Sequence, residues 1–387
     1  MSSNRLPSLW KRFTQKTSRA LSVSWPESDI IIFSEGTAYW NTFKPIVEEL
    51  IERKVPFCYC TLDKNDPGLF IQATEYTPHY LDSGAVGFAK FGMLKAKILL
   101  ATTPNIGCKG FPLARPKKVE CLTHIFHAIS DIAFYRKHSL DYYDTVLTVG
   151  DFALRSIRET EKLRGLKPKE CVSVGAPYFD VLLSTADLKR KKSANAKKTV
   201  LLAPSWGRKG FLSIYGTKFI AELAKLDFNF ILRPHPHSFK HEKRLLEDVE
   251  KIAIASQNIR FDREPDCGLA MAESNILISD SSSIRFDYAF IYQRPVITLR
   301  IPSTELNEFE YADLTFKWLD ELEPRIGPVF SPADRGIITE KITDALLDSK
   351  TYLTYDILKI RERYIAHLGK SGKAVVDWIQ EKGYQRG

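Results

Sequence analysis

The sequence contains no apolar run long enough to cross a bilayer. A spanning helix needs roughly 18 consecutive apolar residues, and the stretch from Ala96 to Ala101 is far shorter. The first residues also lack the continuous apolar segment of a signal peptide, because four basic residues interrupt it: Lys11, Arg12, Lys16 and Arg19. We therefore expect a chain that neither spans a membrane nor carries a secretory signal.

Cysteine is scarce, and its spacing fits neither a zinc site nor a disulfide framework. The six cysteines stand mostly in or beside apolar runs, and no two of them form a CxxC pair. This pattern predicts reduced, buried thiols in a cytosolic protein. The cysteines are Cys58, Cys60, Cys108, Cys121, Cys171 and Cys267.

The charge is basic but not concentrated in one segment. Lys and Arg number 56 against 47 acidic residues, which gives a net charge of +9. Such an excess favours polyanions or an anionic membrane face, but its even spread specifies neither, and we expect no nucleic-acid partner. The 387 residues, 44% of them hydrophobic, suit a soluble enzyme of two domains.

Residues 1–25 predict a basic amphipathic helix. On a helical wheel the apolar side chains share one face and the basic ones occupy the rest. Two interpretations stay open: a helix that lies in a membrane interface, or one that packs on the body of the protein. The apolar face comprises Leu6, Leu9, Trp10, Phe13, Thr17, Ala20 and Leu21, and the basic residues are Arg5, Lys11, Arg12, Lys16 and Arg19.

An α/β rhythm runs through the remaining chain. Apolar runs such as 29–33 and 199–203 alternate with amphipathic helical patterns, which indicates parallel βαβ units. The polar segment 187–198 reads as a linker. We expect two Rossmann-like domains that face a central cleft, with an acceptor-side domain at 26–186, a donor-nucleotide domain at 199–350 and a helical segment at 351–387.

Polar side chains follow three of the predicted strands in the second half of the chain. Because ligands of open α/β sheets bind at the carboxyl ends of the strands, these groups should converge on one site that suits a phosphate ester. Asp280 or Ser282 could instead simply cap the following helix. The groups are Ser205, then Arg233 and His235 in a proline-bounded loop, then Asp280, Ser281, Ser282 and Ser283.

A second histidine pair stands in the first half of the chain. His124 and His127 are spaced to share one helical face, but a loop fits equally well. Metal ligation would need partners that the sequence does not offer nearby. A structural histidine and a general base are the remaining interpretations.

In this order the motifs resemble the CDP-glycerol glycerophosphotransferase family of teichoic-acid and capsule synthesis, over roughly residues 30 to 299. The stretches that carry the resemblance are Phe33-Ser34-Glu35-Gly36, His127-Ala128-Ile129-Ser130, Val174-Gly175-Ala176-Pro177-Tyr178-Phe179-Asp180, Pro204-Ser205-Trp206, Arg233-Pro234-His235-Pro236 and Ser279-Asp280-Ser281-Ser282-Ser283 with Phe286-Asp287-Tyr288. One departure is that Ala-Ile-Ser follows His127 where the family has Gly-Thr-Pro, so the acceptor side is expected to be reshaped.

The resemblance implies a GT-B-like fold and transfer of glycerol phosphate, or a related polyol phosphate, from a CDP-linked donor to a hydroxyl of a glycan or lipid-linked acceptor, with release of CMP. His127 matches the base, and Arg233, His235 and the serines after Asp280 match donor-phosphate ligands. His235 is also a catalytic candidate, and Asp280 is a substrate-binding candidate. Ser205, Glu35 and Gly36 are further substrate-binding candidates. The resemblance also implies a cytoplasmic enzyme on the inner, anionic face of the cell membrane. No DxD metal site is visible, and a divalent cation on the pyrophosphate stays open.

Two rival functions remain. The nearest is a GT-B glycosyltransferase or nucleotide-sugar epimerase that binds a UDP-sugar in a similar cleft. The other is a catalytically silent scaffold, held at the membrane by the N-terminal helix, and it would show no turnover or turnover insensitive to changes at His235. Neither the polyol nor the acceptor follows from the sequence.

Overall fold

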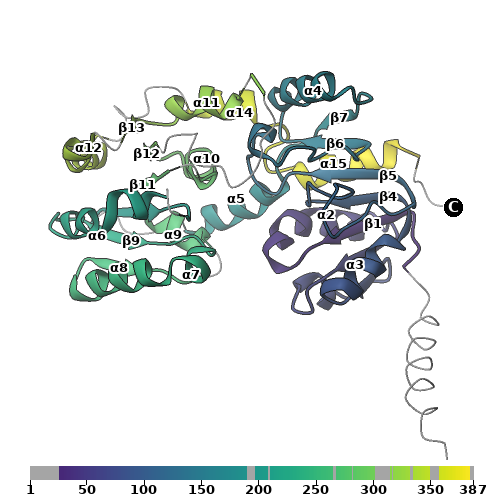
Figure 1. Cartoon of the computed structure of the whole chain (residues 1–387), viewed down its shortest axis with the longest axis horizontal. Coiled ribbons are helices and arrows are strands. Elements are labelled where there is room, and N and C mark those ends of the chain that lie inside the picture. The colour runs from purple at the N-terminus through teal and green to yellow at the C-terminus, as the bar shows by residue number, and fades with distance from the viewer. Residues whose placement is uncertain are drawn as a thin grey trace, which may run out of the picture.

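The computed structural model shows two α/β domains side by side (Figure 1). It describes residues 26–189, 197–207, 210–264, 267–280, 282–300, 314–315, 317–331, 334–348 and 357–383. The predicted helix at 1–25 and most of the predicted linker at 187–198 lie outside the described residues. Ser281 does as well.

The first domain is built on a seven-stranded sheet with the order β3-β2-β1-β4-β5-β6-β7, and every described pairing in it is parallel. Its apolar central strands are buried on both faces, as parallel sheets require. The strands are β1 (Ile30–Ser34), β2 (Phe57–Thr61), β3 (Tyr76–Tyr80), β4 (Lys95–Ala101), β5 (Lys118–Ile125), β6 (Thr145–Thr148) and β7 (Glu170–Ser173).

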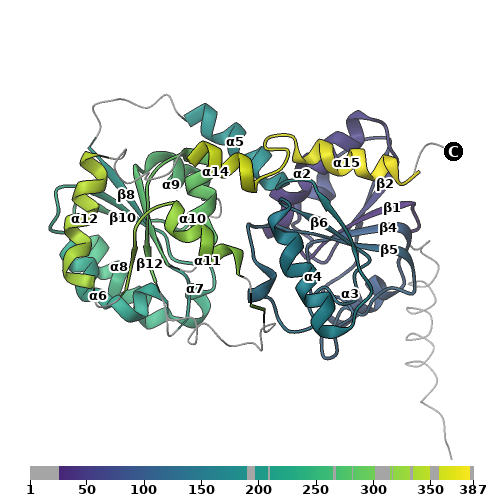
Figure 2. The ribbon, with the colours of Figure 1, turned by 90° about the horizontal axis from the view of Figure 1, so that it is seen from above.

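Helices cover both faces of this sheet (Figure 2), and every connection between its consecutive strands except that from β4 to β5 contains a helical element. Helix α2 has apolar residues at helical spacing, and its buried face includes Phe43, Val47 and Leu50. The helical elements are η1 (Thr37–Tyr39), α2 (Trp40–Glu52), η2 (Pro67–Phe70), α3 (Gly84–Gly92), η3 (Ile132–Phe134), α4 (Phe152–Arg164) and α5 (Pro177–Lys189).

The second domain has a six-stranded sheet with the order β10-β9-β8-β11-β12-β13, again with parallel pairing throughout. Its strands are β8 (Thr199–Ala203), β9 (Asn229–Leu232), β10 (Ile259–Phe261), β11 (Ile276–Ser279), β12 (Val296–Leu299) and β13 (Val329–Phe330). Its helical elements are α6 (Phe211–Leu223), α7 (Ser238–His241), α8 (Lys243–Ala255), α9 (Gly268–Glu273), α10 (Ile284–Asp287), the π-helix η4 (Tyr288–Tyr292), α11 (Trp318–Leu322), η6 (Glu323–Arg325) and α12 (Arg335–Leu347).

The C-terminal segment returns from the second domain to the first. The helical segment expected at 351–387 contains two helices in its described part, α14 (Ile357–Tyr364) and α15 (Ser371–Glu381), which a turn with positive φ at His367 and Gly369 separates. The Arg361 guanidinium of α14 donates to the carbonyl of Phe290. Helix α15 packs on α2 and α5, so that α5, α14 and α15 bridge the domains along one side of the molecule (Figure 2).

Gly175 lets the C-terminal segment pack closely against the first domain. Its φ is +86°, and a Cβ at this position would overlap the carbonyl oxygen of Ala366. Only glycine combines that φ with so close an approach. The carboxylate of Asp180, in the next helix, accepts the backbone N–H of Gly372 at 2.9 Å. The Gly-Ala-Pro-Tyr-Phe-Asp motif therefore docks the C-terminal segment.

The hydrophobic core is continuous across the domain junction. One cluster joins Phe179 of α5 with Met271 of α9 and Phe290 of η4. Burial of such large apolar side chains contributes about 1.5–3 kcal/mol each. The two domains are thus packed together along α5 in addition to their covalent connection.

Candidate functional site

Three neighbouring strands of the second domain end beside the predicted donor residues. Strands β9, β8 and β11 are adjacent in the sheet, and because they are parallel their carboxyl ends share one edge. His235 follows β9, Ser205 follows β8, and Ser282 follows β11. The structure therefore brings the three loops to one edge of the sheet.

Asp280 has a different role from the predicted ligand. It is fully buried, and its carboxylate oxygens accept the backbone N–H groups of Ser205 at 2.9 Å and of Phe211 at 2.8 Å. Burial raises its pKa, and these backbone bonds oppose the rise. Since both oxygens accept backbone N–H groups, Asp280 fixes the loop between β8 and α6.

His235 lies in a stack of aromatic rings. Its ring is parallel to that of His237, with an angle of 12° and 5.4 Å between centroids, and the indole of Trp206 lies 5.0 Å from His237. The backbone N–H of His237 donates to Nδ1 of His235 at 3.2 Å. In the neutral ring the proton is therefore on Nε2, which makes Nε2 a hydrogen-bond donor.

The charge state of His235 follows from its surroundings. Burial, and to a smaller extent the neighbouring His237, lower the pKa of His235 to about 4. The imidazole is neutral near pH 7. It can donate through Nε2 to a phosphate oxygen without carrying a charge.

Arg233 is paired within the protein. Its Nη1 contacts Oδ2 of Asp262 at 2.7 Å, with 12% and 7% of the two side chains exposed. Asp262 follows β10, and its other oxygen accepts the N–H of Glu264. Asp262 was not predicted, although it is a polar residue directly after the short strand β10. The guanidinium is thus oriented by a carboxylate of the same domain.

The serines after Asp280 precede α10. Ser283 occupies the N-cap position without a side-chain cap hydrogen bond, and the hydroxyl of Ser282 accepts the N–H of Ile284 at 3.5 Å, a weak contact. Of the two residues in the capping interpretation, Asp280 binds Ser205 and Phe211 and not the start of α10, and Ser282 makes only this weak contact. Ser281 lies outside the described residues.

In the first domain, Glu35 and Gly36 follow β1. Gly36 has a φ of +150°, and a Cβ there would press on the side chain of Asp63. Burial raises the pKa of the half-buried Glu35. Burial and the nearby charge of Glu35 also raise the pKa of Tyr39 to about 12. Tyr39 was not predicted, because one tyrosine at a helix start carries no distinctive sequence signal.

The two histidines at the end of β5, His124 and His127, have different environments. They lie on a strand end and in the following loop, so the shared helical face is wrong. His124 is fully buried among Phe126 and Tyr143, and neither ring nitrogen has a hydrogen-bond partner among the described residues. Burial, with a smaller effect of His127, lowers its pKa to about 3. His124 is a structural residue.

His127 is partly exposed beyond the end of β5. Its ring meets that of Tyr39 edge-on, at 5.0 Å between centroids. Burial of its ring nitrogens lowers its pKa to about 4, and Nδ1 has no hydrogen-bond partner among the described residues. His127 is therefore neutral at pH 7 and able to accept a proton. Glu35, Tyr39 and His127 all follow strands or turns at the same edge of the first sheet.

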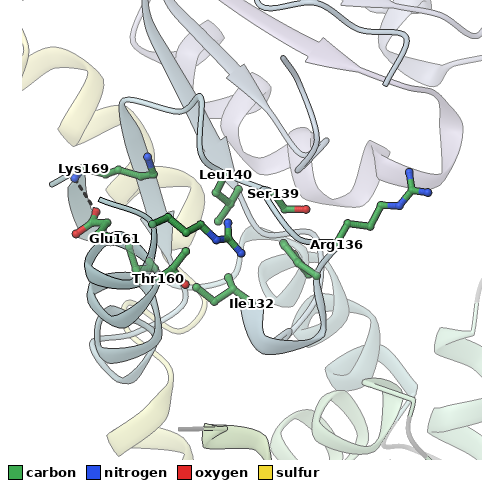
Figure 3. A pocket seen from close by; sticks show the side chains of 10 residues that line it. Ile132, Arg136, Ser139, Leu140, Thr160, Glu161 and Lys169 are labelled. Atoms are coloured by element: carbon green, nitrogen blue, oxygen red, sulfur yellow. Dashed lines mark hydrogen bonds between the residues drawn. The ribbon is translucent and has the colours of Figure 1, made fainter. Parts of the chain in front are cut away.

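A small pocket elsewhere in the first domain contains none of these residues. It lies between the 132–140 segment and α4 (Figure 3). Its charged groups bind within the protein: Lys169 donates to the carbonyls of Asp141 and Tyr143, and Glu161 accepts the backbone N–H of Lys169. Arg136 points away from Lys169 and Glu161 (Figure 3). We therefore interpret this pocket as a structural feature and not as a ligand-binding site.

Several features of the described part of the chain bear on cofactors and membranes. No group of three or more His, Cys, Asp or Glu side chains there is arranged to hold a metal ion. No helix among the described residues is long and apolar enough to cross a membrane. The six cysteines form no disulfide with one another, and Cys58 and Cys60 are buried in β2.

Comparison with protein families gives one match. Residues 130–311 match the family described as CDP-Glycerol:Poly(glycerophosphate) glycerophosphotransferase. This match includes Arg233, His235 and Asp280 and begins just beyond His127. No curated protein sequence matches the chain.

Several solved structures have a similar fold. The wall teichoic acid polymerase TagF is 14% identical, with 97% of this chain and 94% of that chain covered and a TM-score of 0.62. A UDP-GlcNAc 2-epimerase from Neisseria meningitidis, bound to UDP-GlcNAc, is 14% identical over 91% and 99% of the two chains, with a TM-score of 0.59. These similarities confirm the predicted GT-B-like arrangement of two parallel sheets.

Proposed function

We propose that this chain is a transferase of the CDP-glycerol glycerophosphotransferase type, the family whose model matches residues 130–311, and that it moves glycerol phosphate, or a related polyol phosphate, onto a hydroxyl of a surface-glycan or lipid-linked acceptor. The donor is a CDP-linked polyol. The acceptor oxygen attacks the phosphorus that bears the polyol, the bond from this phosphorus to the bridging oxygen breaks, and CMP leaves.

The observation that carries this proposal is a pair of neutral imidazoles at the carboxyl edges of the two sheets. Burial lowers the pKa of both His127 and His235 to about 4. His235 has its proton on Nε2 because Nδ1 is occupied by the N–H of His237. One ring is therefore suited to accept a proton and the other to donate a hydrogen bond.

His235 would act on the donor phosphates. Phosphoryl transfer depends chiefly on in-line positioning and on stabilising charge at the phosphate oxygens. Nε2 of His235 donates to one of these oxygens, and Arg233, oriented by Asp262, adds positive charge beside it. Ser282 and Ser283 follow β11 at the same edge of the sheet and supply hydroxyl donors.

His127 would act on the acceptor. The attacking hydroxyl must lose its proton as the bond to phosphorus forms. A neutral imidazole with a lowered pKa is available as a base throughout the physiological pH range. Glu35 and Tyr39 lie at the same edge of the sheet and would orient the acceptor hydroxyl.

The N-terminal segment would hold the enzyme at the cytoplasmic face of the membrane. Its sequence places Trp10 and Phe13 on the apolar side of a helix and Lys11, Arg12, Lys16 and Arg19 on the basic side. Aromatic residues enter the interface and basic residues meet anionic head groups. A lipid-linked acceptor would be reached from that position.

A donor screen tests the proposed function. The purified full chain is incubated with a lipid-linked or glycan acceptor and, in parallel, CDP-glycerol, CDP-ribitol or UDP-GlcNAc, and released nucleotides and products are measured by mass spectrometry. We expect CMP and a product heavier by one polyol phosphate. Release of UDP or an epimerised sugar alone would support the rival function, and repetition with a chelator tests the divalent cation.

A further inference from the structure

One tyrosine hydroxyl connects loops of the two domains. Oη of Tyr178, in α5, accepts the backbone N–H of Ile129 at 3.0 Å and donates to Oδ1 of Asp287 at 2.7 Å. Ile129 belongs to the loop after β5 in the first domain, and Asp287 ends α10 in the second. A single hydroxyl thus uses both its acceptor and its donor capacity across the junction.

Because Tyr178 and Asp287 are shielded from water, losing either hydrogen bond would be unfavourable. Only 7% of Tyr178 is exposed. Burial raises the pKa of Asp287 to about 7, whereas the hydrogen bond from Tyr178 opposes the rise. Burial also raises the pKa of Tyr178, so the hydroxyl keeps its proton. A buried carboxyl group that loses its donor is destabilised, which favours the connected arrangement over an open one.

The connection reaches both halves of the candidate site. Ile129 is two residues from His127, and Asp287 is four residues from Ser283. Helix α5 lies at the junction of the two domains (Figure 1), where it packs against α9 and η4. A change in the Tyr178 hydrogen bonds is therefore transmitted over a few backbone bonds to each loop.

We propose that Tyr178 is a positioning residue for phosphoryl transfer, which aligns the His127 loop with the donor-side loop through Ile129 and Asp287. The proposal rests on the proposed function of His127 as the base. Tyr178 itself touches neither substrate in this account. It decides whether the acceptor oxygen stands in line with the phosphorus.

The expected size of the effect follows from the geometry of attack. Misplacement of reacting groups by about 1 Å can lower a rate by roughly 10². Donor binding uses residues of the second domain and should not require this alignment. We therefore expect loss of Tyr178 hydrogen bonds to lower kcat about 10- to 100-fold while KM for the donor changes less than about threefold.

The test uses three single variants, one double variant and one matched control. Tyr178→Phe keeps the ring and removes both hydrogen bonds, whereas Asp287→Leu removes the acceptor and Asp287→Asn retains a carbonyl that Tyr178 can bind. The control is Tyr288→Phe, which alters a neighbouring buried tyrosine whose hydroxyl binds Ser274 within the second domain. Transfer kinetics with CDP-glycerol and amide hydrogen exchange at Ile129 are measured on each full-length protein.

We expect Tyr178→Phe and Asp287→Leu to lower kcat to a similar extent, their combination to add little, and Asp287→Asn to retain most of the rate. Exchange at Ile129 should accelerate in Tyr178→Phe and not in Tyr288→Phe. Unchanged kcat in a folded Tyr178→Phe protein, or a rate loss equalled by Tyr288→Phe, would overturn the proposal. Parallel loss of donor affinity would do so as well. Absence of transfer by the unaltered protein would instead refute the proposed function, while the exchange measurement would still test the hydrogen bond.

Discussion

The backbone N–H of His237 donates to Nδ1 of His235 over 3.2 Å. This contact decides which nitrogen of His235 is protonated, because an imidazole nitrogen that accepts a hydrogen bond cannot carry the proton of the neutral ring. It follows that a substrate group bound to Nε2 must be an acceptor. A phosphate oxygen meets that requirement.

Replacement of His235 should reveal this donor. We expect His235→Ala to lower kcat/KM for CDP-glycerol by about 10² or more. His235→Gln should retain more activity than His235→Asn, because the longer amide places its N–H closer to the position of Nε2. Steady-state kinetics would measure both effects. As a control, His241→Ala removes another ring of the Trp206 stack and should change the rate only slightly. Equal rates for His235→Ala and the unaltered enzyme would make His235 structural.

Replacement of His127 should separate binding from chemistry. His127→Ala should keep donor affinity and lose transfer by about 10²–10⁴, because a base acts in the transition state and not in ground-state binding of the donor. Calorimetry with CDP-glycerol and product analysis would measure the two quantities. His79→Ala is the matched control, since His79 is a half-buried histidine on β3, away from β5 in the same sheet. A collapse of donor binding together with transfer would assign His127 to the donor site or to structure.

The decrease in unfolding free energy at acidic pH should depend on His124. Its folded-state pKa of about 3 is below its ordinary value of 6.5 because the ring is buried, so the unfolded chain binds a proton that the folded chain excludes. This contribution is fully present above pH 6.5 and is lost as pH falls toward 3, at about 1.4 kcal/mol per pH unit. His124→Phe should reduce the loss of unfolding free energy between pH 6.5 and pH 5 by about 2 kcal/mol. Urea titrations at both pH values would show it, and identical pH profiles would contradict the assignment.

The buried carboxylate of Asp280 should be needed for folding and, through its loop, for donor binding. Asp280→Ala leaves the N–H groups of Ser205 and Phe211 without acceptors, which should cost about 2–4 kcal/mol of unfolding free energy. The denaturant concentration at the midpoint of unfolding and the affinity for CDP-glycerol should both fall. Asp227→Ala, at a side chain that is 98% exposed, should change stability by less than about 0.5 kcal/mol. A stable Asp280→Ala protein with lost transfer alone would show a direct catalytic role instead.

Membrane binding should depend on the N-terminal segment. A chain that begins at Trp25 should stay folded, lose binding to anionic liposomes and retain transfer to a short soluble acceptor. Each basic residue near such a surface contributes about 1 kcal/mol, so binding of the full chain should weaken as salt is raised. Liposome sedimentation with and without anionic lipid would measure it. Equal binding by both chains would exclude this segment as the anchor, and loss of folding would favour a helix packed on the body.

Strands composed almost entirely of apolar residues were predicted from the sequence. Strands that mix apolar residues with charged residues or proline were missed. The apolar runs of β1 and β8 read directly as buried parallel strands. Strand β5 was missed because it contains Lys118, Glu120 and His124. Strand β3 was missed because it contains Pro78, and proline usually argues against a strand. Proline is tolerated here because β3 is the edge strand of the sheet. The donor loops could be placed because parallel strands end at a common edge.

The sequence by itself determined which chemical groups stand at the strand ends, since local apolar patterns fix the strands and the residues after them. Only the tertiary structure decided what those groups bind. Asp280 reaches the N–H of Phe211, Arg233 reaches Asp262, and Tyr178 reaches Asp287. Each pair joins residues far apart in the chain, and the choice between a bond to the protein and a bond to a ligand depends on distances and burial that no local pattern encodes.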